Sequence, residues 1–241
     1  MKKNFVSTLL TAFVALSLIA CGNTNQKETS SGNSVSKSSK QEDVSQEKHQ
    51  EISIVESGYS IKSDSIGGVY VYYGITLSNP NKKLALQFPV ITVTGKSEDG
   101  SIIGTHDQTL YYIAPDDTVS FGGLMSCNGA VPTTVDITAT SGDFISGTND
   151  DIVPSSAFTI SNTNELIGTY GNVSYTGEII NNTDKAYTSV QVTVLLKNNG
   201  TIVYGDSTYV SDLPANGSKA FELSTYDVPE HTEYILSAQC W

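Results

Sequence analysis

The sequence predicts an all-β protein in which two sandwiches follow one another along the chain. Beyond residue 51, segments rich in β-branched and aromatic residues recur, at 69–73, 90–94, 134–138, 190–196 and 234–236. Asn-Gly and Asp-Gly pairs lie between such segments, and these pairs readily adopt the positive φ angles of tight hairpin turns. No segment of useful length has the periodicity of an amphipathic helix. Short strands joined by turns indicate antiparallel sandwiches or barrels.

Residues 1–20 have the pattern of a secretory signal peptide. Lys2 and Lys3 precede an uncharged, mainly apolar run from Phe5 to Ala20. A basic start, a short apolar core and a small residue before the cleavage point are typical of such signals. The run is shorter than the roughly 20 apolar residues that a membrane-spanning helix needs, so we expect cleavage after Ala20.

The residues Leu18-Ile19-Ala20-Cys21 resemble the lipobox of bacterial lipoproteins. The resemblance implies that a diacylglyceryl group is attached to the Cys21 thiol and that the mature chain begins there. Two acyl chains, palmitate for example, anchor a protein stably where one chain does not. We therefore expect an extracytoplasmic protein anchored to the cell membrane by lipid. The lack of arginine and the Ser/Lys-rich segment that follows favour a Gram-positive surface.

Residues 21–51 are expected to form the lipidated cysteine and a disordered tether. Polar and charged residues dominate residues 22–51, and Val35 and Val44 are the aliphatic residues of this segment before Ile52. Such a composition buries too little apolar surface to offset the entropy of ordering. A flexible coil of this length reaches about 30 Å. We expect His49, near its end, to be solvated.

Two copies of one pattern follow the tether, at residues 52–146 and 152–241, and a segment rich in Gly and Asp joins them. An ordered series of matches supports this division: 73–80 with 176–183, 90–94 with 190–194, Asp99-Gly100 with Asn199-Gly200, Ala114-Pro115 with Leu213-Pro214, and Phe121 with Phe221. Matches in constant order at a nearly constant offset are typical of an internal repeat.

In this alignment Gly74 corresponds to Gly177, and Asn79 corresponds to Asn182. We expect the glycines to permit a close backbone contact or a bulge. We expect the asparagine side chains to close turns, and Phe121 and Phe221 to fill the cores.

Each copy thus has a glycine, an asparagine five residues later, an alternating strand, an Asp/Asn-Gly turn, a second strand, a proline and a late phenylalanine. This order resembles the FxLYD-type domain, an immunoglobulin-like β-sandwich of bacterial lipoproteins and surface proteins. The motif itself is degenerate: Thr193, Leu196 and Lys197 stand where Phe, Tyr and Asp occur, and the first copy has Gly95-Lys96-Ser97 instead. The resemblance implies two tandem antiparallel immunoglobulin-like domains that act in adhesion, scaffolding or partner binding.

Charge excludes one class of partner. The chain has 25 acidic residues against 13 lysines, and its formal net charge is −12. Nucleic-acid binding requires a basic surface that neutralises phosphates, so we expect no nucleic-acid partner. An acidic chain is also unsuited to lying flat on anionic lipid. Acidic surface charge keeps an extracellular domain soluble.

Two cysteines remain after Cys21. In an oxidising compartment, Cys127 and Cys240 are candidates for a disulfide between the copies, and the sequence leaves open whether they are bonded. The cysteines and histidines lack the spacing of zinc ligands. Asn149-Asp150-Asp151 offers oxygen atoms but lacks the pattern of a calcium-binding loop, so calcium binding stays open and no cofactor or metal is expected.

The sequence offers little for catalysis. It has no Gly-x-Ser-x-Gly nucleophile motif. The neighbours His106 and Asp107 form a possible acid–base pair without a counterpart in the second copy. The acids Asp116 and Asp117 are adjacent on a turn, whereas the two carboxylates of a glycosidase flank the sugar bond. We therefore expect no enzyme activity.

Tyrosine is abundant, with 13 residues. Alternation places Tyr70 and Tyr72 on one face of their strand, where exposed rings would suit an interface. Tyrosine also favours strands for reasons unrelated to binding. We expect a non-enzymatic, lipid-anchored surface protein whose domains bind a protein partner or an envelope component, with Tyr70 and Tyr72 as the candidate surface. The alternative is a polysaccharide- or cell-wall-binding module.

Overall fold

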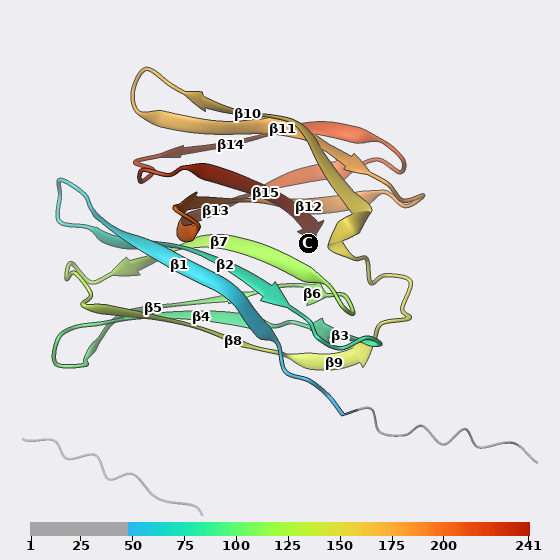
Figure 1. The fold of residues 1–241 in the computed structure, drawn as a ribbon, viewed down its shortest axis with the longest axis horizontal. Coiled ribbons are helices and arrows are strands. Elements are labelled where there is room, and N and C mark those ends of the chain that lie inside the picture. Colours follow the sequence, from blue (N-terminus) through green and yellow to red (C-terminus); the bar gives the residue numbers. More distant parts are fainter. Residues whose placement is uncertain (1–47) are drawn as a thin grey trace, which may run out of the picture. The chain divides into compact units, whose positions relative to one another are not determined.

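A computed structural model describes residues 48–241, and these residues form antiparallel β-sheets (Figure 1). The all-β fold class is thereby confirmed. The predicted signal peptide, the lipidation site Cys21 and most of the tether lie outside the described residues. Within residues 48–241, no helix has the length and apolar character needed to cross a membrane.

The first repeat has two main sheets and one short sheet. One main sheet has the order β1-β2-β7, with β1 at Ser53–Ser63, β2 at Val69–Ser78 and β7 at Thr118–Cys127. The other has the order β5-β4-β8, with β4 at Val90–Lys96, β5 at Ile102–Thr109 and β8 at Thr134–Thr140. The short sheet has the order β6-β3-β9, with β3 at Leu84–Gln87, β6 at Tyr112–Ile113 and β9 at Asp143–Ser146.

The short sheet continues the β5-β4-β8 sheet after a break. Each of its strands is separated from a strand of the larger sheet by two residues, and the order of the strands is the same. Phe88 has a φ of 55° and is followed by Pro89, while Gly142 has a φ of 67°. A positive φ interrupts the extended backbone, and proline removes a donor from the ladder. These residues account for two of the three breaks.

The second repeat has two sheets without such a break. One has the order β10-β11-β14, with β10 at Phe158–Ile167, β11 at Asn172–Asn181 and β14 at Ser218–Tyr226. The other has the order β13-β12-β15, with β12 at Tyr187–Asn198, β13 at Thr201–Leu213 and β15 at Glu233–Cys240. A single 3-10 turn, Ser155–Ala157, precedes β10. Among the strands of residues 48–241, no sheet combines strands of both repeats.

A buried asparagine closes the turn after β2 and after β11. The Asn79 amide donates to the carbonyl oxygens of Leu84, Ile113 and Ala114, at 2.8, 3.1 and 2.9 Å. The Asn181 amide likewise donates to the carbonyls of Lys185 and Pro214, at 2.7 and 2.9 Å. The structural counterpart of Asn79 is therefore Asn181.

The expectation that Asn182 has this role is wrong by one residue. A slip of one residue in a strand exchanges its two faces, so the counterparts on β2 and β11 also change. Tyr73 now corresponds to Tyr175, and both are fully buried. Gly74 corresponds to Thr176 rather than to Gly177.

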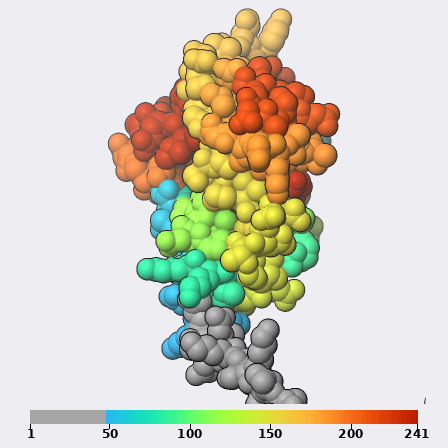
Figure 2. Space-filling model, turned by 90° about the vertical axis from the view of Figure 1, so that its right-hand side faces the viewer, coloured from blue at the N-terminus to red at the C-terminus, as the bar shows by residue number. Residues whose placement is uncertain are grey.

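The two sandwiches stack into four layers of sheet (Figure 1). The β1-β2-β7 sheet of the first repeat packs against the β13-β12-β15 sheet of the second, with β13 lying across β1, β2 and β7. Figure 2 shows the orange and red second repeat above the blue and green strands of the first. The β5-β4-β8 and β10-β11-β14 sheets form the outer layers.

Glycines bring the two inner sheets into backbone contact. Gly58, Gly74 and Gly122 are register partners and form one row across β1, β2 and β7. Gly205 of β13 lies against this row: a Cβ atom on it would be 2.7 Å from the carbonyl oxygen of Tyr73 and 2.8 Å from the Cα atoms of Gly122 and Gly74. Only glycine permits such an approach of two backbones.

Polar contacts surround the glycine row. The Ser207 hydroxyl donates to the Gly122 carbonyl at 3.2 Å and lies 2.9 Å from the Thr193 hydroxyl. Lys197 forms an ion pair with Glu56 of the first repeat, with 2.7 Å between Nζ and Oε2 and only 13% of the lysine side chain exposed. Ser207, Thr193 and Lys197 therefore find partners between the repeats, as buried polar groups require.

The last residues of the predicted tether contact the first repeat. The His49 ring stacks on Phe144 with 4.6 Å between ring centroids. The Gln50 backbone N–H donates to Asn81 at 2.9 Å, and the Asn81 amide donates back to the Gln50 carbonyl at 2.7 Å. His49 is thus exposed but stacked, and residues 49 and 50 of the predicted tether already contact the first repeat.

We predict that Gly205→Ala weakens the packing of the two repeats. The added methyl group meets backbone atoms of Tyr73, Gly122 and Gly74, which cannot rotate away. Overpacking of this kind costs about 1–3 kcal/mol, and urea denaturation measures the loss in the free energy of unfolding. Thr105→Ala, at the corresponding exposed position of β5, is the matched control. Equal stability of the two variants contradicts the assigned role of the glycine row.

Candidate binding surface

The β10–β11 turn and the adjoining end of β14 carry the most exposed apolar residues of the second repeat. Leu166, Ile167, Tyr170 and Tyr226 are 54, 81, 91 and 62% exposed. We call these four residues the tip patch. In Figure 1 this turn lies at the upper left of the molecule. Large exposed apolar residues that gather at one place mark interaction sites more often than scattered ones do.

The strand register explains how the tip patch forms. Ile167 is the last residue of β10 and pairs with Val173, and Asn172 of β11 pairs with Tyr226 of β14. The turn between them is closed by a hydrogen bond of 2.8 Å from the Gly168 N–H to the Asn172 carbonyl. Gly171, with a φ of 80°, supplies the left-handed residue that the turn requires. The final rungs of three strands thus present the patch, with Leu166 and Tyr226 on the outer face of the sheet and Ile167 on the face of the buried Val173.

A groove of about 450 Å³ lies beside the tip patch and shares Ile167 with it. Its apolar lining includes Val173 and Val228, and its acidic lining consists of Glu165 and Glu230. The remaining lining residues come from the end of β12 and from the β14–β15 loop. The groove therefore opens between the two sheets at the end of the second sandwich.

A hydrogen-bonded cluster supports the wall of the groove. The Tyr175 hydroxyl donates to Glu165 Oε1 at 2.9 Å, and His231 Nε2 lies 2.7 Å from the same oxygen. His231 Nδ1 lies 3.0 Å from the carbonyl oxygen of Pro229. Both ring nitrogens thus lie beside oxygen atoms, and the ring connects Glu165 to the β14–β15 loop.

The cluster holds the end of the second repeat in shape. Burial raises the pKa of Tyr175, and its hydrogen bond to Glu165 acts in the same direction, so the hydroxyl remains a donor at neutral pH. The three side chains connect β10, β11 and the β14–β15 loop. Their polar groups are hydrogen-bonded to one another. The cluster is therefore suited to a structural role beneath the tip patch rather than to catalysis.

The first repeat has a related contact at the corresponding tyrosine. The Tyr73 hydroxyl lies 3.1 Å from His106 Nδ1. Asp107 instead accepts a hydrogen bond of 2.7 Å from the Thr92 hydroxyl. Neighbours in a strand point to opposite faces, so the structure does not bring the side chains of His106 and Asp107 together.

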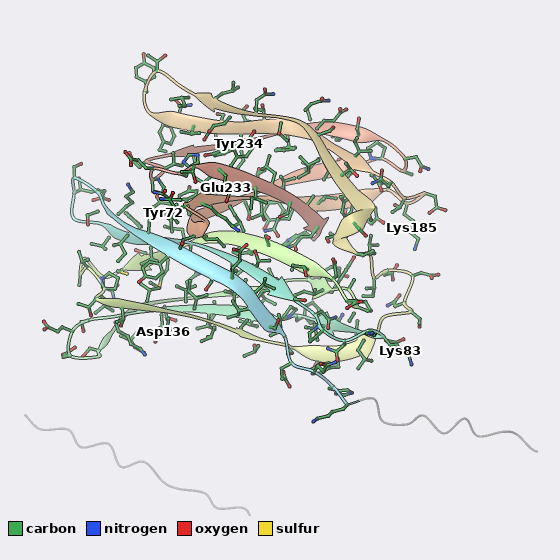
Figure 3. The ribbon with its side chains drawn as sticks, viewed as in Figure 1. Tyr72, Lys83, Asp136, Lys185, Glu233 and Tyr234 are labelled. Atoms are coloured by element: carbon green, nitrogen blue, oxygen red, sulfur yellow. The ribbon has the colours of Figure 1, made fainter. Side chains whose placement is uncertain are left out.

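Tyr70 and Tyr72, the predicted surface, are both half-buried. The Tyr70 hydroxyl donates to Asp64 at 3.2 Å. The Tyr72 ring stacks on Tyr204, with 5.1 Å between centroids and 25° between planes, and Figure 3 places it at the level where the two repeats meet. Binding through Tyr70 and Tyr72 stays a prediction, but one face of the Tyr72 ring is already occupied.

The two cysteines of the described residues are free thiols. Cys127 belongs to the core of the first repeat, whereas Cys240 lies beside Tyr112 at the end of β15. The candidate disulfide between Cys127 and Cys240 is thus not formed. Burial raises the pKa of both thiols, which keeps them protonated and unreactive at neutral pH.

The segment Asn149-Asp150-Asp151 forms a local turn in which Asn149 Oδ1 accepts the Asp151 N–H at 3.0 Å. In the part of the chain from residue 48 onward, no group of three or more His, Cys, Asp or Glu side chains is placed to hold a metal ion. The lipidation site, Cys21, precedes this part of the chain.

The sequence analysis missed the tip patch. Its signal was a hairpin turn, Ile167–Asn172, with large apolar residues where polar ones are usual. The cluster of Tyr175, Glu165 and His231 had no such signal, since its members are separated by ten residues or more.

Comparisons with known proteins add no assignment. No family model matches the chain, and no curated protein matches it. Among solved structures, the chain is similar to Bacteroides uniformis beta-glucuronidase 2 covalently bound to cyclophellitol-6-carboxylate aziridine, at 15% sequence identity and a TM-score of 0.23. The match covers 70% of this chain and 24% of the other, so the chain spans about a quarter of that structure's length. A likeness of this size carries no argument about activity.

We predict that Asp206 makes the protein less stable as the pH rises above about 4. Burial raises the pKa of Asp206 from its ordinary value of 3.8, and a hydrogen bond from the Ser207 N–H offsets this only in part. The folded protein therefore binds more protons than the unfolded chain between the two pKa values, so stability falls across that window. Asp206→Asn removes this decrease, which thermal unfolding between pH 3 and pH 8 measures.

The exposed Asp150→Asn is the control for this comparison. The difference in Tm between wild type and Asp206→Asn is expected to grow with pH until Asp206 is ionised. A difference that is independent of pH contradicts the prediction.

Proposed function

We propose that this chain is a lipid-anchored, non-enzymatic surface protein that binds a protein partner through the tip patch. The observation that carries the proposal is the exposure of Leu166, Ile167, Tyr170 and Tyr226 at one end of a stacked pair of sandwiches. In this proposal both sandwiches are immunoglobulin-like. Their two three-stranded sheets, with orders β10-β11-β14 and β13-β12-β15 in the second repeat, support that assignment.

The position of the tip patch suits an anchored protein. The described chain enters the first repeat at the Ser53 end of β1, and the β1–β2 turn lies at the other end of this strand. An extended strand of 11 residues spans roughly 35 Å. In Figure 1 the β1–β2 and β10–β11 turns lie at the same end of the molecule. A tether that starts at a lipidated Cys21 would therefore join the end opposite the tip patch.

The mechanism is presentation at a surface. Anchoring confines the patch to the membrane and raises its effective concentration near partners in the same envelope. The glycine contact between the repeats and the Tyr175 cluster hold the patch in a fixed place. A preorganised surface loses less entropy when it binds.

An exposed aromatic pair favours a second function, binding to wall polysaccharide. Phe88 and Tyr111, at the break between β3 and β4, are 47 and 45% exposed, and their ring centroids are 6.1 Å apart. Exposed aromatic rings suit stacking on sugar rings. This pair lies on the first repeat, so substitutions separate it from the tip patch.

We predict that substitutions in the tip patch abolish retention of a protein partner. The experiment passes three proteins in detergent over immobilised membrane proteins and over purified wall polymer. They are the wild-type full chain, Ile167→Ser/Tyr170→Ser and Phe88→Ser/Tyr111→Ser. Polar replacements at exposed positions change folding stability by less than about 0.5 kcal/mol, so a loss reports binding. The proposal is supported if the Ile167→Ser/Tyr170→Ser variant is no longer retained on the membrane proteins. If instead only the Phe88→Ser/Tyr111→Ser variant loses retention, and only on wall polymer, the result supports polysaccharide binding.

We predict that Cys21→Ser prevents membrane attachment. The variant lacks the thiol that would carry the diacylglyceryl group, so it is expected to incorporate no labelled palmitate and to appear outside the membrane fraction. Cys240→Ser keeps Cys21 and is the matched control. Labelled palmitate on the Cys21→Ser protein contradicts the lipoprotein assignment.

A further inference from the structure

We propose that two copies of this chain pair through their β8 strands, edge to edge and antiparallel. Ile137 lies on the twofold axis of the pair. The three-stranded β5-β4-β8 sheets of the two copies thereby join into one continuous sheet. The pair forms without the tip patch, so it goes beyond the proposed function and stands or falls separately from it.

The outer side of β8, in the lowest layer of Figure 1, has backbone groups without partners. β8 pairs with β4 alone, and the register is unbroken from Thr134 to Thr140. Within residues 48–241, no hydrogen bond from another strand, loop or side chain reaches the main chain of these residues. Such an edge presents a row of donors and acceptors on which another strand can pair.

The other edge strands of the four main sheets are protected. Proteins commonly protect an edge with a bulge, a lysine, a proline or a covering segment. Register shifts interrupt β1, β5, β10 and β13. The backbone of Gly122 in β7 is hydrogen-bonded to the Ser207 hydroxyl, β14 contains Lys219, and β15 lies beside the 3-10 turn and β7. β8 has no bulge, lysine or proline.

The segment before β1 contacts the short sheet rather than β8. His49 stacks on Phe144 of β9, and the Ile52 N–H donates to the Ser141 hydroxyl at 2.8 Å. Both contacts lie beyond Thr140, the last residue of β8. These contacts therefore leave the edge of β8 open.

The apolar side chains of β8 are incompletely covered. Val135, Ile137 and Ala139 pack against the core of the first repeat but remain half-exposed. Val93 on β4, the register partner of Ile137, is fully buried because β4 has a neighbouring strand on each side. A strand added beside β8 would cover its apolar side chains in the same way, and burial of apolar surface favours pairing.

The sequence of β8 is compatible with an identical strand. An antiparallel pair centred on Ile137 sets polar residues opposite polar ones and apolar residues opposite apolar ones: Thr134 with Thr140, Val135 with Ala139, and Asp136 with Thr138 of the other copy. Like charges directly opposite one another destabilise a sheet, and this register has none. The twofold axis makes the contact closed, so it ends at two copies.

β8 is also electrically balanced, although the chain is acidic. Asp136 is the one charged residue of the strand, and its Oδ2 atom is 2.6 Å from Nζ of Lys96 on β4. The net charge of −12 on each copy is screened beyond about 8 Å at physiological ionic strength. A second copy thus supplies a strand that matches this edge in length, polarity and charge.

The first test places a charge at position 138, which faces Asp136 of the other copy. Thr138→Asp adds a like charge, Thr138→Lys adds an opposite charge, and the twofold axis makes each contact occur twice. We expect the first to raise and the second to lower the dissociation constant by about 2- to 30-fold. Sedimentation equilibrium measures it on the full chain at about 1–100 μM. All proteins carry Cys21→Ser, so that neither a lipid nor a further thiol interferes.

The matched controls make the same changes at the far edge of the same sheet. Thr109→Asp and Thr109→Lys lie at an exposed position of β5, and we expect them to leave the dissociation constant unchanged. Circular dichroism checks that all four variants fold. Shifts in the same direction for Thr138→Asp and Thr138→Lys overturn the inference, and so do equal shifts for the Thr109 variants.

The second test detects a pair too weak for sedimentation and reports its register. Thr134→Cys and Thr140→Cys are prepared separately, and oxidised glutathione serves as the oxidant. The register sets these two positions opposite one another between copies, but sets neither opposite itself. We therefore expect a disulfide-linked dimer in the mixture and none from either variant alone. A wild-type chain that sediments as a monomer, together with no disulfide in the mixture, overturns the inference and leaves the edge to a strand of another protein.

Discussion

The close contact of two backbones at Gly74, Gly122 and Gly205 determines how the rest of the structure is arranged. A sheet face that carries side chains packs about 10 Å from its neighbour, whereas glycine lets main-chain atoms meet. The contact fixes the position of β13 over the β1-β2-β7 sheet. The Lys197–Glu56 ion pair, the Ser207 hydroxyl and the stacking of Tyr72 on Tyr204 all depend on that position.

The sequence predicted the strands well because their signals are local. Alternation, β-branched residues and Asn-Gly turns depend on neighbouring positions, and the antiparallel sheets of both repeats follow from them. The internal alignment was less accurate, because it relied on matching Gly74 with Gly177. A glycine has no side chain, so the sequence alone does not show which face of the strand its position belongs to. The buried amides of Asn79 and Asn181 gave the correct register.

The site was harder to predict, for a different physical reason. Whether an apolar residue is exposed depends on whether another sheet covers it. The packing of the two repeats on each other determines this, and it involves residues far apart in the sequence. Tyr72 and Tyr170 are both tyrosines in or beside strands, yet the first lies against Tyr204 and the second is 91% exposed. The groove needs Glu165 and His231, which are 66 residues apart, and no local pattern joins them.

The row that corresponds to Gly58, Gly74 and Gly122 in the second repeat consists of Asn164, Thr176 and Glu222. These side chains stand on the outer face of the β10-β11-β14 sheet, where a further sandwich would have to approach. These side chains keep the backbone of another sandwich at a distance. Close packing on this face would also remove water from the Glu222 carboxylate. Stacking is a head-to-tail contact, which can continue without limit unless one end is blocked. The polar row is such a block, because it keeps a third sandwich from packing on this face as closely as the two repeats pack on each other.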